Sequence, residues 1–212
     1  MVTGLARLHV ITPADSPDRV LGTVDQALCG GAPLVQLRVK GVEDRWWWQL
    51  AEEAARRCHR VGATCVVNDR ADIAAAAGAD GVHLGDHDLP VAEVRSVFGP
   101  AAVVGATCRS AEAARRAEDE GATYLGVGPA YTTFTKAGLP GPIGPEGVAE
   151  VVAAVGLPVI AIGGVTIARV GALLEAGAYG VAVCAAVFGA ADPRAATAEL
   201  AAAIEAREWS SP

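Results

Sequence analysis

The sequence predicts an α/β fold, a single (β/α)8 TIM barrel over residues 1–212, from two observations. Five segments share one pattern, in which Gly-Ala and two variable residues lead into a short apolar run that ends in a polar or small residue. Each segment follows an Ala-rich amphipathic stretch, so its glycine falls where a helix end favours a left-handed residue. The apolar run itself is typical of a parallel strand covered on both faces. Alternating strand and helix units of this kind favour a closed barrel.

The expected elements follow one another at short intervals. The five repeats give strands at 31–38, 62–69, 78–85, 121–128 and 177–184, and similar runs give strands at 7–12, 102–107 and 157–164. Helical patterns cover roughly 18–29, 43–60, 70–77, 90–98, 110–120, 145–155, 166–176 and 192–206. A doubly wound open sheet is the alternative, but no G-x-G-x-x-G turn follows the first expected strand.

The composition excludes several classes of function. The chain is 52% hydrophobic with a formal net charge of -7, so it lacks the clustered Lys and Arg that nucleic-acid binding requires. Its five cysteines have no C-x-x-C spacing, which is typical of reduced thiols. No signal-peptide pattern is apparent, and no apolar run reaches the about 20 residues that cross a bilayer. We therefore expect a soluble cytoplasmic protein that binds neither nucleic acid nor membrane.

Polar and basic residues alternate after the second expected strand. Gln36, Arg38 and Lys40 are two residues apart, so on an extended segment their side chains face one ligand. A set of surface charges is the alternative, and the alternation favours a binding role. Lys40 and Lys136 are the only lysines of the chain, and both fall in loops of the expected site. With Arg38 they predict a positive pocket for a phosphate ester, in particular a diphosphate.

Acidic residues follow the next two expected strands. Asp69 comes directly after Asn68 at the end of the third strand, and Asp88 follows the fourth. Two carboxylates at neighbouring strand ends suit Mg2+, which takes one or two carboxylates together with phosphate oxygens. Each aspartate could instead cap the helix that begins just after it, near Arg70 and Pro90. The sequence leaves both interpretations open.

The Gly163-Gly164 turn after the seventh expected strand suggests a second anion site. It opens a helix at Thr166, at a place where barrels often bind phosphate through backbone N–H groups. Two anion sites in one barrel suggest a reaction between two phosphorylated partners. The Trp46-Trp47-Trp48 run lies inside an expected helix, and we interpret it as packing against the barrel or a partner subunit.

The order and spacing of six segments resemble the thiamine-phosphate synthase family over nearly the whole chain. The segments are "VQLRVK", "VVNDRADIAAAAGADGVHLGDHDL", "VGAT", "YLGVGPAYTTFTK", "PVIAIGGV" and "GVAVCAAVFGAADP". The resemblance implies a Mg2+-dependent transferase that joins 4-amino-2-methyl-5-(diphosphooxymethyl)pyrimidine to a (carboxy)thiazole phosphate. Diphosphate would leave first, and the thiazole nitrogen would then attack a pyrimidine cation.

The resemblance also assigns residues to the two substrates. The pyrimidine diphosphate would be bound by Gln36, Leu37, Arg38, Val39, Lys40, Asn68, Thr107 and Lys136. The thiazole phosphate would be bound by Thr133, Phe134, Thr135, Gly164, Cys184 and Ala185. Mg2+ would be held by Asp69 and Asp88. Lys136, Arg38 and Lys40 would be catalytic, because neutralising the departing charge is the main task of the protein.

Four positions depart from the pattern of the family. The family usually has Glu at Val39, Ser at Thr107, His at Arg109, and an Ile/Val-Ser pair at Cys184-Ala185. Thr107 keeps a hydroxyl, and Val39 is expected to point away from its basic neighbours. Ala185 lacks a hydroxyl, which leaves phosphate binding there to backbone N–H groups.

Two other functions remain as alternatives. A thiazole tautomerase of the same barrel family resembles the synthase but lacks its complete Asn-Asp and Thr-x-Thr-Lys sets, both of which are present here. A non-catalytic, regulatory ligand-binding relative would have no need of Asp69, Asp88 and Lys136. The sequence does not define the preferred thiazole tautomer, and it is compatible with a homo-oligomer.

Lys136→Ala is expected to lower kcat by about 10²–10³-fold, because a contact that strengthens as negative charge develops lowers the barrier. Lys136→Arg should recover only part of the rate, since a planar guanidinium fits an ammonium pocket poorly. Steady-state kcat and KM of the three proteins test this. An unchanged kcat in Lys136→Ala would mean that the lysine is a solvated loop charge.

Overall fold

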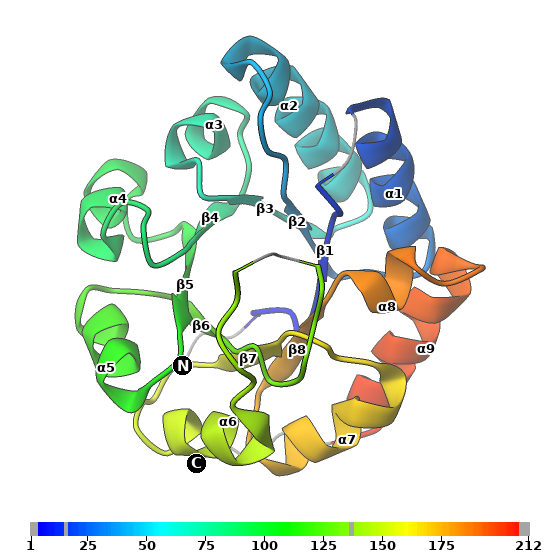
Figure 1. The fold of residues 1–212 in the computed structure, drawn as a ribbon. Coiled ribbons are helices and arrows are strands. Elements are labelled where there is room, and N and C mark those ends of the chain that lie inside the picture. Colours follow the sequence, from blue (N-terminus) through cyan, green and yellow to red (C-terminus); the bar gives the residue numbers. More distant parts are fainter. Residues whose placement is uncertain (1–3, 15–16, 136–137, 208–212) are drawn as a thin grey trace.

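The computed structural model of the chain describes residues 4–14, 17–135 and 138–207. Eight parallel strands pair in chain order, and the eighth pairs with the first, so that the sheet closes into a barrel. Helices form a ring around the strands (Figure 1). The predicted (β/α)8 fold is therefore confirmed.

The strands are short and evenly spaced. They are β1 (Leu8–Ile11), β2 (Leu34–Leu37), β3 (Thr64–Asn68), β4 (Gly81–Leu84), β5 (Val103–Cys108), β6 (Tyr124–Val127), β7 (Val159–Ile162) and β8 (Gly180–Val183). The helices are α1 (Pro17–Cys29), α2 (Asp44–Arg60), α3 (Ala71–Ala76), α4 (Val91–Phe98), α5 (Ala111–Asp119), α6 (Gly144–Val152), α7 (Ile167–Glu175), α8 (Ala185–Phe188) and α9 (Pro193–Glu205). No described helix is long and apolar enough to span a bilayer.

Seven strands lie inside their predicted ranges, β5 extends one residue beyond its range to Cys108, and one described helix was not predicted. The four residues of α8 follow β8 directly and precede α9. Four residues make little more than one helical turn, so they carry no amphipathic repeat from which a helix could be recognised. This short helix places the backbone after β8 next to the mouth of the barrel.

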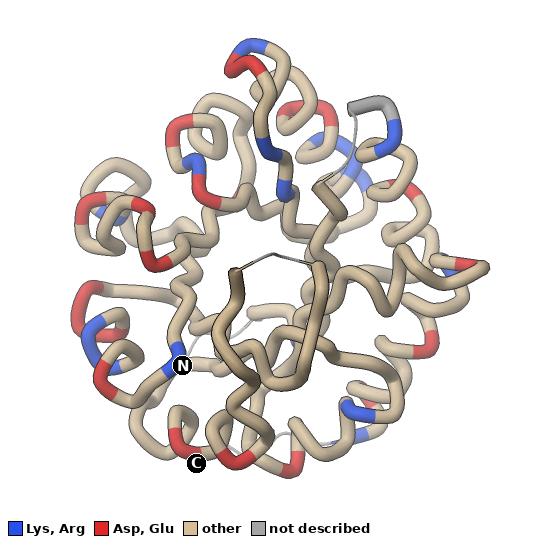
Figure 2. Tube along the Cα trace, in the orientation of Figure 1, with Lys and Arg blue, Asp and Glu red and all other residues tan. Residues whose placement is uncertain are grey.

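Alternation along the strands creates two apolar cores. One set of strand side chains, with Val10, Leu37 and Val67 among its members, packs with the inner faces of the helices. A smaller set, with Ile11, Tyr124 and Ile160, packs inside the barrel. Charged residues lie mostly on the helices and loops around the barrel (Figure 2). Both faces of the sheet are thus covered, as an all-parallel sheet requires.

The three tryptophans of α2 pack rather than project into the barrel. Trp47 is buried in the main core, and Trp46 and Trp48 are partly buried against it. The indole nitrogen of Trp48 donates a hydrogen bond to the carbonyl oxygen of Ala76 at the end of α3, at 3.0 Å. These contacts agree with the packing interpretation of the Trp run.

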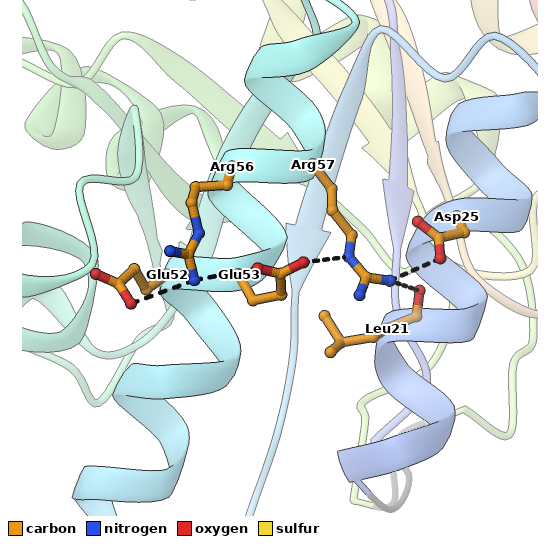
Figure 3. Close-up of polar contacts among 6 residues, drawn as sticks. All are labelled: Leu21, Asp25, Glu52, Glu53, Arg56 and Arg57. Carbon is orange, nitrogen blue, oxygen red and sulfur yellow. Dashed lines mark hydrogen bonds and ion pairs between the residues drawn. The ribbon is translucent and has the colours of Figure 1, made fainter.

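Arg57 joins two neighbouring helices of the ring (Figure 3). Its Nε donates to Glu53 Oε1 at 2.8 Å on α2, and its Nη1 donates to Asp25 Oδ2 at 2.6 Å on α1. Nη1 also lies 3.4 Å from the carbonyl oxygen of Leu21. The side chain of Arg57 is only 22% exposed, against 59% for the adjacent Arg56. Water therefore screens the ion pairs of Arg57 less than those of Arg56.

Arg57→Met is expected to lower the free energy of unfolding by about 1–2 kcal/mol, because it breaks charged hydrogen bonds between α1 and α2. Arg56→Met is the matched control. Arg56 pairs only with Glu52 and Glu53 of its own helix among the described residues, so its loss should cost less than about 0.5 kcal/mol. Urea unfolding of both variants measures the difference, and equal effects would contradict this role of Arg57.

Candidate active site

A cavity of about 210 Å3 lies at the carboxyl ends of the strands. The segment between β6 and α6 passes over the mouth of the barrel in the view of Figure 1, and Thr133, Thr135 and Leu139 of this segment line the cavity. Eleven of the predicted site residues line it: Gln36, Arg38, Lys40, Asn68, Asp69, Thr107, Thr133, Thr135, Gly164, Cys184 and Ala185. Residues from six strand ends therefore meet at one site.

Four of the predicted residues do not line the cavity, and one is not described. Leu37 and Val39 are buried in the main core between sheet and helices, which leaves their backbone groups for any contact with a ligand. Phe134 is 94% exposed. Asp88 reaches the site only through Asp69, as shown below. Lys136 lies outside the described residues.

The ends of β2 and β3 form a polar wall. Gln36 is buried, and its Nε2 donates to Asn68 Oδ1 at 2.9 Å. Thr12, which the sequence analysis missed, is fully buried, and its Oγ1 accepts a hydrogen bond from the backbone N–H of Arg38 at 2.9 Å. This bond holds the residues that follow β1 and β2 side by side beyond the last backbone pair of the two strands. The alternation of Gln36, Arg38 and Lys40 toward the cavity is thereby maintained.

The two aspartates form a carboxyl pair rather than helix caps. Neither α3 nor α4 has a side-chain hydrogen bond at its N-cap, where Arg70 and Pro90 stand. Asp88 Oδ2 accepts from the backbone N–H of Gly85 at 2.7 Å. Asp69 and Asp88 lie close enough to shift each other's pKa, and Lys40 Nζ forms an ion pair with Asp69 Oδ2. The capping alternative is therefore wrong for both residues.

The carboxyl pair has opposite pKa shifts. Burial raises the pKa of Asp69, but its interactions with Lys40 and Asp88 outweigh burial and bring the pKa below its ordinary value. Burial raises the pKa of Asp88, and the negative charge of Asp69 raises it further, against the effect of the Gly85 N–H. The two carboxyl groups therefore ionise in sequence, Asp69 before Asp88, and a divalent cation held by both would relieve the repulsion between their charges.

The backbone at Asp69 is also unusual. Its φ is 68°, and it is the one described residue other than glycine with a positive φ. Aspartate and asparagine tolerate this left-handed conformation better than other residues, because their short polar side chains hydrogen-bond locally. The turn aims the carboxylate at Lys40 and Asp88.

The glycine turn after β7 packs tightly under the segment between β6 and α6. Gly164 has a φ of 64°, and a Cβ at this position would lie 2.5 Å from the carbonyl oxygen of Thr132 and 2.8 Å from Tyr131 Cβ. Arg169, near the start of α7, donates to the carbonyl oxygen of Gly164 at 2.7 Å and stacks on the ring of Tyr131. Arg169 was not singled out from the sequence, because one arginine in a helix gives no signal there.

Arg109, where the family usually has His, holds the other end of the same segment. Its Nη2 donates to the carbonyl oxygen of Gly141 at 2.8 Å. Arg109 and Arg169 thus fasten the segment to β5 and α7. Within the segment, Thr133 Oγ1 and Thr135 Oγ1 lie 3.2 Å apart, within hydrogen-bonding distance.

Cys184 is not an activated nucleophile. Burial raises the pKa of its thiol to about 11, although the positive charge of Arg38 opposes the effect. A thiol with this pKa is protonated at neutral pH and therefore a poor nucleophile. Cys184 and Ala185 bring the start of α8 to the cavity, where their backbone is the polar part.

The comparisons with known proteins agree on one family. A family model described as thiamine monophosphate synthase matches residues 8–187. The chain is 50% identical to a thiamine-phosphate synthase from Salinispora arenicola over 206 residues, which cover 96% of this chain and 99% of that one. It is 49% identical to the thiamine-phosphate synthase of Salinispora tropica over 211 residues, covering 98% and 100% of the two chains.

A solved structure supports the same assignment. The thiamine phosphate pyrophosphorylase from Pyrococcus furiosus superposes with a TM-score of 0.84 and 35% sequence identity, covering 94% of this chain and 96% of that one. The barrel, the polar cavity at its carboxyl rim and the length of the matches all lead to one conclusion. The chain belongs to the thiamine monophosphate synthase family.

Proposed function

We propose that the chain joins 4-amino-2-methyl-5-(diphosphooxymethyl)pyrimidine to a (carboxy)thiazole phosphate and releases diphosphate. The observation that carries the proposal is that an amide pair and a basic pair line one cavity, with a carboxyl pair at its edge. The amide pair is Gln36 and Asn68, and the basic pair is Arg38 and Lys40. The carboxyl pair is Asp69 and Asp88. These groups match a polar ring, a diphosphate and a metal ion.

The amide pair suits an aminopyrimidine ring. With the Gln36–Asn68 hydrogen bond in place, the Oε1 of Gln36 and the Nδ2 of Asn68 are available as an acceptor and a donor. An amino group next to a ring nitrogen presents the complementary donor and acceptor. The burial of Gln36 keeps water from competing with such a ligand. We therefore place the pyrimidine ring against the ends of β2 and β3.

The basic pair suits the diphosphate. Arg38 can bind phosphate oxygens through two parallel N–H groups, and Lys40 adds a compact charge beside it. Thr107, on the β5 side of the cavity, offers a hydroxyl to the same group. As the C–O bond breaks, negative charge grows on the departing oxygens, so fixed cations stabilise the transition state more than the bound substrate.

The carboxyl pair fits Mg2+. Asp69 and Asp88 lie close enough to shift each other's pKa, and Mg2+ prefers one or two carboxylates with phosphate oxygens beside them. When bound, the metal would supply further positive charge to the diphosphate. Lys40 would then turn from Asp69 toward the diphosphate.

The thiazole phosphate fits the opposite side of the cavity. Thr133 and Thr135 offer hydroxyl groups there, and Gly164, Cys184 and Ala185 offer backbone N–H groups. The turn at Gly164 has no room for a side chain because Tyr131 and Thr132 pack against it, so only a glycine keeps this turn beside the threonines. The two substrates would therefore meet between β2–β3 and β7–β8.

The alternatives are less favoured by this arrangement. A tautomerase would need no diphosphate pocket, and a non-catalytic binding protein would need no carboxyl pair placed to hold a metal ion beside it. Turnover of the purified protein with both substrates, with Mg2+ and with excess chelator, tests the proposal directly. If thiamine phosphate forms at an undiminished rate in chelator, the metal is not part of the reaction. If no product forms with either thiazole tautomer, the proposed activity is refuted.

Asp69→Asn and Asp88→Asn are each expected to lower turnover by about 10²-fold or more, since each removes a metal-binding charge. Asparagine keeps the left-handed backbone at position 69 and the acceptor for the Gly85 N–H at position 88. The fold should therefore survive both changes. Thermal stabilisation by Mg2+ with inorganic diphosphate should also be lost.

Asp86→Asn is the matched control for the carboxyl pair. Asp86 is exposed in the same loop as Asp88 and does not line the cavity, so its charge should not affect turnover. A loss in Asp86→Asn equal to that in Asp88→Asn would mean that the net charge of the loop, rather than a metal site, is responsible.

Gly164→Ala should weaken binding of the thiazole phosphate about tenfold or more, because the new Cβ would push the segment with Thr132 away from the glycine turn. Gly62→Ala is the control for the backbone effect. Gly62 also has a positive φ, 74°, but lies between α2 and β3 with open space around it. Both variants should lose about 1–2 kcal/mol from left-handed strain, and only Gly164→Ala should raise KM for the thiazole phosphate.

A further inference from the structure

A row of polar side chains runs from the cavity, which His83 and Thr107 line, into the interior of the barrel. His83 on β4 has both ring nitrogens in hydrogen-bonding distance of hydroxyl groups. Its Nδ1 lies 3.0 Å from Tyr124 Oη on β6, and its Nε2 lies 3.0 Å from Thr107 Oγ1 on β5. Thr107 lines the cavity, whereas Tyr124 is fully buried below it. The row thus leads from the barrel interior to the ligand site.

Two strand glycines make room for this row. A Cβ at Gly105 on β5 would overlap the ring of Tyr124 and lie 2.5 Å from His83 Nδ1. A Cβ at Gly126 on β6 would lie 2.8 Å from His83 Cε1. The ring of His9 packs edge-on against Tyr124 from below, with 4.8 Å between ring centroids. The rings of His83 and Tyr124 are therefore held in place from several sides.

The direction of the first hydrogen bond follows from the surroundings of Tyr124. Among the described residues, His83 is the one hydrogen-bond partner of its hydroxyl. Burial raises the pKa of Tyr124 well above its ordinary value, so the hydroxyl keeps its proton. If His83 Nδ1 donated to Tyr124, the hydroxyl proton of Tyr124 would be buried without an acceptor, which is unfavourable. Tyr124 therefore donates, and His83 Nδ1 accepts.

The direction of the second hydrogen bond follows from the first. A neutral imidazole whose Nδ1 accepts carries its proton on Nε2. Nε2 then donates to Thr107 Oγ1. No other described residue is hydrogen-bonded to the Thr107 hydroxyl, so its own proton is left for a group in the cavity.

We propose that Tyr124 is a positioning residue that holds His83 as the Nε2–H tautomer and thereby makes the Thr107 hydroxyl a hydrogen-bond donor to the ligand. Thr107 would then favour a ligand atom that only accepts hydrogen bonds, such as a phosphate oxygen. In the opposite arrangement, Thr107 would donate to His83 and offer the ligand only lone pairs, which repel an oxyanion. The ligand class rests on the proposed function, but the tautomer does not.

The tautomer can be tested without any ligand. In protein labelled with 15N-histidine, the His83 resonances are identified as those that disappear in His83→Gln. They should show a protonated Nε2 and an unprotonated Nδ1. Tyr124→Phe should shift the His83 resonances, because the donor to Nδ1 is gone. A protonated Nδ1 in the unaltered protein would overturn the proposal, even if Tyr124→Phe failed to fold.

The consequence for binding is tested with inorganic diphosphate and Mg2+ as the probe, by calorimetry. Tyr124→Phe should bind it about tenfold more weakly, since Thr107 is no longer held as a donor to a charged acceptor. Tyr179→Phe is the matched control, because it also removes one tyrosine hydroxyl, which donates to the carbonyl oxygen of Leu5 at 2.6 Å away from the cavity. Its affinity should stay unchanged.

The possible failures are distinguishable. If the unaltered protein does not bind diphosphate, the proposed diphosphate site is wrong while the tautomer result still stands. If the unaltered protein binds it and Tyr124→Phe binds equally well, the positioning role of Tyr124 is refuted. Equal weakening in Tyr124→Phe and Tyr179→Phe would refute it as well, since that result reflects general loss of stability.

Discussion

Closure of the parallel sheet is the constraint on which the rest of the structure depends. Each strand is covered by helices outside and by side chains of other strands inside, so nearly every strand position must be buried. All four residues of β1 and of β8, the two strands that close the barrel, are buried. Closure also brings eight carboxyl ends to one rim, where residues far apart in the chain meet.

The functional groups at that rim are held by their neighbours on the strands. Gln36 is fixed by Asn68, the backbone of Arg38 by Thr12, and Thr107 by His83. Groups fixed in this way need little reorganisation when charge develops on a ligand, and this pre-organisation is the main source of electrostatic catalysis. The strands thus supply the geometry that loops alone would provide less well.

The carboxyl pair shows that the site is not arranged for stability. The negative charge of Asp69 raises the cost of ionising Asp88, and Asp69 itself has a left-handed backbone conformation. Asp69 is in part relieved by Lys40, which is also one of the two cations proposed to meet the diphosphate. The unliganded site therefore stores an unfavourable charge arrangement that a cation and an anionic substrate would relieve together.

The loops contribute at the other side of the cavity. Arg109 binds the carbonyl oxygen of Gly141 near the end of the segment between β6 and α6. Arg169 binds the carbonyl oxygen of Gly164 in the glycine turn that this segment covers. Arginine suits this task, because one guanidinium donates several hydrogen bonds and can stack on an aromatic ring at once. The threonines of the segment are thereby brought to the cavity without being part of a strand.

The sequence alone determined the barrel, because its Gly-Ala repeats and short apolar runs reflect local rules for helix ends and buried strands. It also indicated most of the polar side chains that line the cavity, since Gln36, Arg38 and Asn68 stand at strand ends and face inward by simple alternation. Only the tertiary structure decided that Asp69 and Asp88 pair instead of capping helices, and that Thr12, Tyr124 and Arg169 support the site. The physical reason is that these contacts join strands and loops far apart in the chain, whose distance and direction depend on barrel closure and carry no local signal.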